Sequence, residues 1–370
     1  MGKTKLFILN TLVLILSSLL IKIISSSFDI YLANIIGAET LGIYSLVISI
    51  YMFFVTIATS GINLAITKII SEEVEKKEEK NIPIIVKKTI VYTLIFGMLS
   101  LTILVILAPY ICRTWLMNKV KPYVLYTLAL SLPFLSLTSA INGYFLALRK
   151  VVKTSIVSVS MQLIRIYIIW MLVLRIFEAN LNMSVLAIVI ASTTCEILSF
   201  LFLYVLYIKD KKNSKPNKPL SNGSQFTKRL LKISLPIAIT SYIRSGLHTL
   251  KHVLIPIRLK LSGMSYEKAI SNYGIITGMA LPIIFFPTVI VYSYSSLLIP
   301  EFSRLSVEFN KEKMNKDISK LFEITLYFSI FITGIFMAFG KQLGNVLYNT
   351  SGVRMVYKNY CTVNSSNVFR

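Results

Sequence analysis

The chain has 370 residues, of which 55% are hydrophobic and only 15% charged, and its formal net charge is +23. A water-soluble protein of this composition would expose large apolar patches, so an ordinary soluble enzyme or binding domain is excluded. The basic residues lie mainly in short segments between apolar runs, a distribution typical of a multi-span membrane protein and not of a nucleic-acid-binding protein. The three cysteines are isolated and form no pattern typical of a disulfide framework or a metal site.

Nine apolar segments are long enough to cross about 30 Å of hydrocarbon, since an α-helix rises about 1.5 Å per residue. The sequence therefore predicts an all-α polytopic membrane protein. Its expected transmembrane helices, in chain order, are residues 6–33, 41–67, 83–108, 122–147, 154–177, 182–208, 230–257, 271–299 and 319–341.

The connections between these helices alternate in charge. Basic residues concentrate before the first helix and after the second, fourth, sixth and eighth, whereas the opposite connections hold few. Because positively charged loops stay on the cytoplasmic side, the N-terminus is expected to be cytoplasmic. The first apolar run continues into a full span without a small-residue cleavage site, which argues against a cleaved signal peptide. The charged run at 72–80 is expected to be a solvated helix extension.

The longest connection, residues 209–229, is rich in Lys, Asn, Ser and Pro and predicts a flexible cytoplasmic linker. It separates a first six-helix lobe, residues 1–208, from a partial second lobe of three helices, residues 230–348. The remaining residues, 349–370, form an atypical polar tail without helical periodicity.

A weak internal repeat supports two related lobes. Residues 42–72 align without gaps with residues 274–304, so that Gly42 matches Gly274. Duplicated lobes are common in transporters, although aromatic and apolar matches arise easily between membrane helices.

The seventh apolar segment, Ile233–Leu259, carries basic residues in its middle: Arg244, His248, Lys251 and His252. On a helix these positions fall within an arc of roughly 100°. A basic side chain at the bilayer centre costs about 2.5–3.5 kcal/mol, so such groups face a wet cavity or a partner. The segment contains no Asp or Glu. An anion-receiving cavity is therefore the leading hypothesis.

The start of the second span resembles a known family. Residues 36–44, IGAETLGIY, resemble the I-G-A-E-x-x-G-x-Y segment of the polysaccharide and peptidoglycan-precursor flippases of the multidrug/oligosaccharidyl-lipid/polysaccharide exporter superfamily. The residues that carry the motif are Gly37, Ala38, Glu39, Gly42 and Tyr44. A closer resemblance to the stage V sporulation protein B branch is carried by residues 234–259 (SLPIAITSYIRSGLHTLKHVLIPIRL), 273–287 (YGIITGMALPIIFFP) and 297–304 (LLIPEFSR).

This resemblance implies a MATE-like fold, with two six-helix lobes around a central cavity that opens alternately to either side of the membrane. It also implies an undecaprenyl-pyrophosphate-linked saccharide as cargo, the bacterial cytoplasmic membrane as location and a part in spore cortex synthesis. The family usually has more helices than the nine predicted here. A frameshifted or prematurely ended reading frame is the simplest account, and a short variant that pairs with another chain is the alternative.

Flipping such a lipid makes and breaks no bond, but the cavity must replace water around the pyrophosphate. Membrane-embedded cations do this through charge-assisted hydrogen bonds. We assign that role to Arg244 above all, to Lys251 and, from the first span, to Lys22. The alternatives are that Arg244 pairs with Asp29 or Glu196 and only fixes packing, and that Lys251 snorkels to the interface.

Two carboxylates lie inside predicted spans. Asp29 is either a counter-charge or proton- or sodium-linked switch, or a carboxylate near the outer end of its span. Arg165 and Glu196 are expected to form an interhelical ion pair, with an ion or proton path as the alternative. The coupling ion, if any, is not specified by the sequence, and no cofactor is expected.

His248 and His252 have the i, i+4 spacing of a metal-binding pair. No third ligand is near, and Arg244 and Lys251 would repel a cation, so no metal site is expected. Contact with phosphate, pH-sensitive gating and a simple hydrogen bond to a neighbour remain open for the two histidines.

The sequence therefore predicts a flippase whose partners are a lipid-linked saccharide, the bilayer and cell-wall synthesis enzymes. An enzyme is disfavoured, because the chain has no nucleophile motif, no Gly-rich phosphate loop and no acidic metal cluster. A multidrug or cation exporter of the same superfamily is the first rival, although the spans contain more basic than acidic residues. A truncated membrane scaffold that transports nothing is the second.

Overall fold

The structure is a computed structural model that describes residues 3–76, 79–175, 181–212, 223–289, 291 and 311–348. Over these residues the chain is helical, with short turns and no strand, so the predicted all-α fold class is confirmed there. The chain divides into two compact units, one made of Met1–Gly42 with Gly263–Arg370 and the other of Ile43–Ser262.

The first helix, α1 (Lys3–Thr59), has 57 residues, whereas one crossing of the bilayer needs only about 20. Its backbone leaves helical geometry at Gly37, where φ is 76° and ψ is 169°. Glycine adopts such a conformation without a steric penalty, because it has no Cβ. The break lies between the first two predicted spans, so α1 holds both the first span and most of the second.

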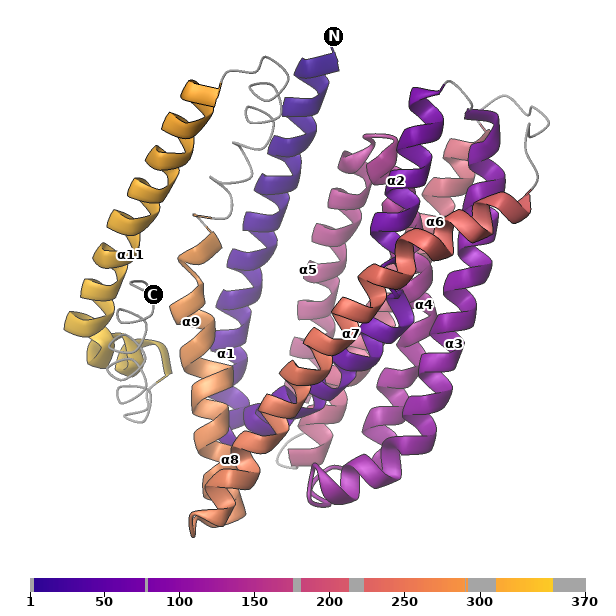
Figure 1. The fold of residues 1–370 in the computed structure, drawn as a ribbon. Helices are drawn as coiled ribbons and strands as arrows, with labels where there is room; N and C mark the ends of the chain where they lie inside the picture. The colour runs from indigo at the N-terminus through magenta and orange to yellow at the C-terminus, as the bar shows by residue number, and fades with distance from the viewer. Residues whose placement is uncertain are drawn as a thin grey trace. The chain divides into compact units, whose positions relative to one another are not determined.

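The helices of the unit Ile43–Ser262 follow the predicted third to seventh spans. After the end of α1 come α2 (Ile62–Glu75), α3 (Ile82–Thr114), α4 (Pro122–Ala147), α5 (Val151–Arg175), α6 (Leu181–Lys212) and α7 (Gly223–Leu261), with a short 3-10 turn at Glu79–Asn81. The central helix is α4, which packs against α2, α3 and α6, while α5 packs on α6 (Figure 1). In the same unit α7 packs against α2 and α3.

Small residues let these helices approach closely. A Cβ on Gly97 of α3 would lie 2.9 Å from the Cα of Pro133 of α4. A Cβ on Gly143 of α4 would lie 2.8 Å from the carbonyl oxygen of Asn63 of α2. Both distances are too short for a real side chain, so glycine is required at both crossings, as is usual where membrane helices meet.

Seven helical stretches among the described residues are long and apolar enough to cross a membrane. The first, Leu16–Val74, contains both of the first two predicted spans. The next four match the third to sixth: Ile82–Thr114, Pro122–Ala147, Val151–Val173 and Met183–Lys211. The predicted seventh span forms a helix, α7, but is not among the seven, because basic and hydroxyl side chains recur along it. These stretches make the chain a multi-pass membrane protein.

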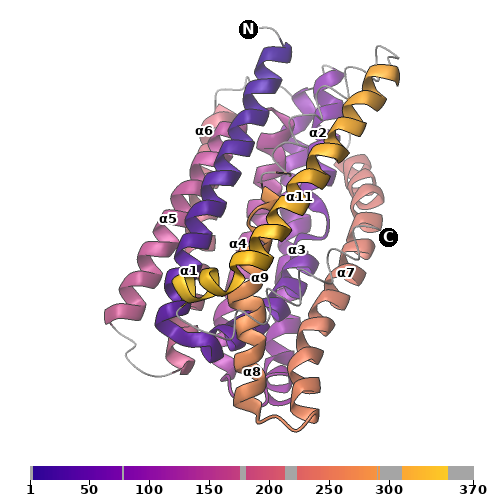
Figure 2. The same cartoon turned by 90° about the vertical axis from the view of Figure 1, so that its left-hand side faces the viewer.

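The other unit contains the predicted eighth and ninth spans. In it α8 (Tyr266–Gly274), the π-helix η2 (Ile275–Ala280) and α9 (Leu281–Phe285) follow one another as a continuous rod (Figure 2), and α11 (Lys311–Tyr348) is the last described helix. Membrane-length apolar stretches occur at Tyr266–Phe285 and Asn315–Gly340. The end of the predicted eighth span and the segment 297–304 lie outside the described residues.

Buried apolar contacts and two hydrogen bonds tie this unit together. Leu41 of α1 packs with Met279 and with Tyr348 of α11. The Tyr348 hydroxyl donates to the carbonyl oxygen of Met279 (2.9 Å), and Nδ2 of Asn34 donates to that of Leu347 (2.8 Å). The N-terminal part of α1 is thus bound to helices more than 200 residues further along the chain.

The predicted linker at 209–229 is helical at both ends, because α6 extends to Lys212 and α7 begins at Gly223. Residues 213–222 and the polar tail at 349–370 lie outside the described residues. The compact units have other bounds than the predicted lobes, so the division into lobes at the linker stays a prediction.

Candidate functional site

A cavity of about 510 Å³ opens beside α7 within the unit Ile43–Ser262, and parts of α1, α2 and α4 complete its wall. Hydroxyl and amide groups are frequent in its lining, which also contains one arginine and one histidine. No carboxylate is present among the described residues that line it. The lining residues are Thr56, Thr59, Gly61, Ile62, Asn63, Leu64, Ser139, Ile237, Ser241, Arg244, Ser245 and His248.

Arg244 supplies the charge of this cavity. Its side chain is exposed, and among the described residues no carboxylate forms an ion pair with it. The alternative partner considered from the sequence, Glu196, is instead paired with Arg165. A guanidinium that faces a hydroxyl-lined cavity donates hydrogen bonds to anionic oxygens through a planar pair of N–H groups.

The start of α2 forms a second part of the wall. Ser60 and Gly61, with φ of 43° and 68°, separate α1 from α2, so a helix begins at Ile62 beside the cavity. No side chain caps this helix start. The first N–H groups of a helix have no intrahelical acceptor and carry partial positive charge. The last turn of α1, whose Thr56 and Thr59 line the same wall, presents carbonyl groups of the opposite partial charge. The electropositive character of the cavity therefore comes from Arg244.

Hydroxyl side chains hold α7 against α1 beside the cavity. Thr249 Oγ1 donates to the carbonyl oxygen of Ser49 (2.9 Å), and both residues are buried. One turn earlier on α7, Thr56 Oγ1 donates to Oγ of Ser245 (3.1 Å). Because these contacts fix the rotation of α7, they determine which of its side chains face the cavity.

The four basic residues singled out in the middle of the seventh span do not all line one cavity. His248 lines the cavity of Arg244, and its Nε2 lies 3.3 Å from Nε2 of His252. Lys251 lines a separate, mainly apolar groove of about 700 Å³ on the leucine-rich flank of α7. Lys251 lies within about 20° of Arg244 around the helix but about 10 Å further along its axis. The predicted headgroup contact of Lys251 therefore stays a prediction.

The predicted residues of the first span lie in the other compact unit. Lys22 is half-buried and Asp29 is exposed, both on the N-terminal part of α1. Their convergence with Arg244 therefore stays a prediction, as does any part of Asp29 in ion coupling.

The family-motif residues lie at a helix break and at helix contacts. Gly37 supplies the break in α1, and Ala38 and Gly42 contact α8 through their backbones. Glu39 and Tyr44 are half-buried. The conformation and small size of the glycines explain these positions without a direct contact to a substrate.

Arg165 of α5 and Glu196 of α6 form the interhelical ion pair that the sequence favoured, with 3.2 Å between Nη2 and Oε1. Both side chains are half-buried. The Nε of Arg165 is buried without a hydrogen-bond partner, so the pair does not satisfy the whole guanidinium. A function in an ion or proton path remains a prediction.

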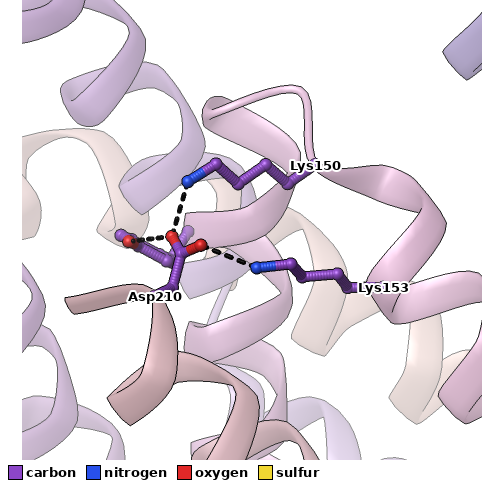
Figure 3. Close-up of polar contacts among 4 residues, drawn as sticks. Lys150, Lys153 and Asp210 are labelled. Atoms are coloured by element: carbon purple, nitrogen blue, oxygen red, sulfur yellow. Dashed lines mark hydrogen bonds and ion pairs between the residues drawn. The ribbon is translucent and has the colours of Figure 1, made fainter. Parts of the chain in front are cut away.

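Sequence reasoning missed a polar cluster around Asp210, near the end of α6. Its carboxylate accepts hydrogen bonds from Lys150 Nζ (2.7 Å), Lys153 Nζ (2.6 Å) and the Tyr144 hydroxyl (2.8 Å) (Figure 3). The Asp210 side chain is 7% exposed. The cluster fastens the turn between α4 and α5 to α6. Its only sequence signal was a single acidic residue amid lysines in the supposed linker.

A second missed cluster corrects the prediction for the charged run at 72–80. Glu73 is buried, and Arg229, near the start of α7, pairs with it (3.1 Å) and with Glu72. Nδ2 of Asn81 donates to the other oxygen of Glu73 (2.8 Å). The run is therefore not simply a solvated extension, because its first residues, Glu72 and Glu73 at the end of α2, bind Arg229 of α7.

A family model described as "Polysaccharide biosynthesis protein" matches residues 7–306. The chain belongs to this family. As a member, it is similar to stage V sporulation protein B of Bacillus subtilis (strain 168), with 22% identity over 356 residues that cover 95% of this chain and 68% of the relative. It is also similar to lipid II flippase MurJ of the same organism, with 23% identity over 352 residues that cover 87% of this chain and 62% of the relative.

The fold of the chain is similar to that of a solved transporter structure. The inward-facing conformation of a multidrug resistance MATE family transporter of the MOP superfamily aligns with a TM-score of 0.67 and 13% identity, covering 92% of this chain and 75% of the other. At that identity the likeness shows the fold alone. The MATE-like fold predicted from the sequence is confirmed.

Proposed function

We propose that the chain is a flippase that moves an undecaprenyl-pyrophosphate-linked saccharide across the bacterial cytoplasmic membrane by alternating access. The observation that carries the proposal is Arg244, which faces a hydroxyl-lined cavity without forming an ion pair with any described carboxylate. The similarity to lipid II flippase MurJ and to stage V sporulation protein B supports a lipid substrate and a part in sporulation. We propose that this part is in spore cortex formation.

The chemistry of the cavity favours an anion. The guanidinium of Arg244 offers N–H donors, and the hydroxyl of Ser241 offers a further donor to phosphate and sugar oxygens. A cavity for organic cations would instead need an acidic group, and the described lining contains none. This favours a pyrophosphate headgroup over the cationic drug of the rival multidrug exporter.

The proposed orientation places the N-terminus in the cytoplasm. The Asp210 and Glu73 clusters then lie at the cytoplasmic end of their unit, where α2, α4 and α6 end and α3, α5 and α7 begin (Figure 1). That end carries the lysine-rich connections, as the positive-inside rule requires. In this orientation α7 runs from the cytoplasm outwards.

The test compares Arg244→Ala and Arg244→Lys in a spore-forming strain that lacks the corresponding flippase and makes no cortex. The alanine variant is expected to lose complementation at normal membrane abundance, because about 1.5–3 kcal/mol of charge-assisted hydrogen bonding is removed. The lysine variant keeps the charge and is expected to retain part of the activity. Wild-type cortex formation by Arg244→Ala would contradict the cavity assignment.

Lys260→Ala is the matched control. Lys260 is an exposed cation of the same helix that lines neither the cavity nor the groove, and its Nζ contacts only the sulfur of Met117 among the described atoms. Its loss is expected to leave complementation intact. Efflux of organic cations without lipid flipping would support the multidrug rival, and normal membrane insertion without transport would support the scaffold.

A further inference from the structure

Three cations of α7 recur at a spacing of seven residues: Arg244, Lys251 and Arg258. Seven residues advance a helix by about 10 Å and return to nearly the same face, with a drift of about 20°. All three side chains are exposed, and none forms an ion pair with a described carboxylate. They form a row of cations, without ion-pair partners among the described residues, from the Arg244 cavity to the end of the helix.

The last two cations stand in an apolar setting. Lys251 and Arg258 line the groove of about 700 Å³, and their companions are mainly large aliphatic side chains: Leu247, Leu250, Leu254, Ile255 and Leu259. Leu247, Leu250 and Leu254 are exposed, so they offer an apolar strip along α7. No acidic residue is among those that line the groove.

From this geometry we infer a second binding site on α7, at Lys251 and Arg258, that takes a lipid with a pyrophosphate headgroup after it leaves the Arg244 cavity. The inference rests on the proposed function, which supplies the direction of travel. The two cations bind the headgroup, and the leucine strip accommodates the polyprenyl chain.

The headgroup and the polyprenyl chain of such a lipid would each be bound by a different part of the groove. A pyrophosphate binds a lysine and an arginine about two turns apart without an acidic competitor. An apolar chain buries surface on the strip at about 25 cal/mol per Å². A free phosphate would gain only the first contribution and a neutral lipid only the second, so a lipid with an anionic phosphate headgroup is the occupant that uses both. The proposed function makes that lipid the pyrophosphate-linked one.

The test uses the full chain in nanodiscs, with a photoreactive benzoylphenylalanine in place of Leu254 in the groove. The probe is undecaprenyl pyrophosphate, and undecaprenol is its uncharged counterpart. A second labelled site, at Leu163 on the exposed face of α5, reports contact with bulk lipid. Undecaprenyl pyrophosphate is expected to crosslink at Leu254 about tenfold more than undecaprenol, and equally with it at Leu163.

Three variants then separate charge from packing. Arg258→Gln and Lys251→Gln are each expected to lower crosslinking at Leu254 several-fold, whereas Lys260→Gln is expected to leave it unchanged. Inorganic pyrophosphate, added at the concentration of the lipid, is expected to compete poorly. Equal crosslinking of the two lipids at Leu254, or an equal effect of Lys260→Gln, would show that the groove contacts bulk lipid only and overturn the inference.

The readout is binding, so it does not depend on transport. If charge-dependent crosslinking occurs but Arg244→Ala still supports cortex formation, the groove site stands and the assignment of the Arg244 cavity fails. If Arg244→Ala abolishes cortex formation but the two lipids crosslink equally at Leu254, the proposed function stands and the second site fails.

Discussion

Gly42 of α1 and Gly274 of α8 meet backbone to backbone. A Cβ on Gly274 would lie 2.7 Å from the backbone nitrogen of Gly42 and would overlap the carbonyl of Ala38. Four residues from each glycine, a second small residue continues the contact: Ala38 on α1, and Gly278, where an added Cβ would lie 3.2 Å from Leu41. This is the small-xxx-small pattern by which membrane helices approach without an apolar driving force.

Gly274→Ala is therefore expected to destabilise the folded protein by about 1–3 kcal/mol, because the added methyl group forces two backbones apart. The measurement is the midpoint of thermal unfolding in detergent. Unfolding is monitored by the loss of the monodisperse peak in size-exclusion chromatography. Gly334→Ala on α11 is the matched control, since a Cβ there meets nothing within 4 Å. It is expected to stabilise by up to about 1 kcal/mol through helix propensity. Equal midpoints for the two variants would contradict the close-packing account.

The Gly42 contact also shows how far the sequence could lead. Apolar length and loop charge predicted the membrane helices, and the glycine in the family motif fell where α1 breaks. The weak repeat that matched Gly42 with Gly274 was used to argue for duplicated lobes. Nothing in it predicted that the two glycines would touch, because contacts between distant segments depend on helix rotation, which hydropathy does not report.

The candidate site was predictable in composition but not in arrangement. An unpaired basic cluster on an apolar helix indicated an anion cavity, and Arg244 does face a polar cavity. Lys251 lines a separate groove because it is about 10 Å further along α7, although it lies on nearly the same face as Arg244. The hydroxyl contacts of Thr249 and Ser245 fix the rotation of α7, which hydropathy does not report. Single charges such as Asp210 were read as linker, because a buried partner cannot be recognised from neighbours in sequence.

Asp210→Asn is expected to lower stability by about 1–2 kcal/mol. The substitution removes the charge that Lys150 and Lys153 share, although the partial exposure of both lysines, 42% and 36%, reduces the effect through solvent screening. Thermal midpoints of purified protein measure it. Asp317→Asn, at a half-buried aspartate on α11, is the control and is expected to be neutral. An unchanged midpoint for Asp210→Asn would mean that the cluster does not hold the α4–α5 turn.

The pairing of Arg229 with Glu73 predicts energetic coupling between the start of α7 and the end of α2. In a double-mutant cycle, Arg229→Gln and Glu73→Gln are each expected to destabilise, and the double variant by less than their sum, with a coupling of about 1–3 kcal/mol. The reason is that Glu73, 3% exposed, is left as a buried charge when its partner is removed. Additive effects would show that the ion pair contributes nothing.

Variants of Arg165 and Glu196 can distinguish a purely structural ion pair from one that takes part in transport. In the unchanged protein Arg165 and Glu196 form an ion pair with 3.2 Å between nitrogen and oxygen. The exchanged variant, Arg165→Glu with Glu196→Arg, can still form an ion pair, but the carboxylate is on α5 and the guanidinium on α6. If the pair only joins α5 to α6, each single change is expected to lower stability by about 1–3 kcal/mol, and the exchange is expected to restore both stability and lipid flipping in part. If Glu196 carries a proton or ion, the exchange restores the thermal midpoint but not flipping, because the carboxylate has moved to the other helix. Parallel measurements of thermal midpoint and vesicle flipping on the same preparations decide between the two, with Glu196→Gln as the variant that removes the charge while keeping the shape.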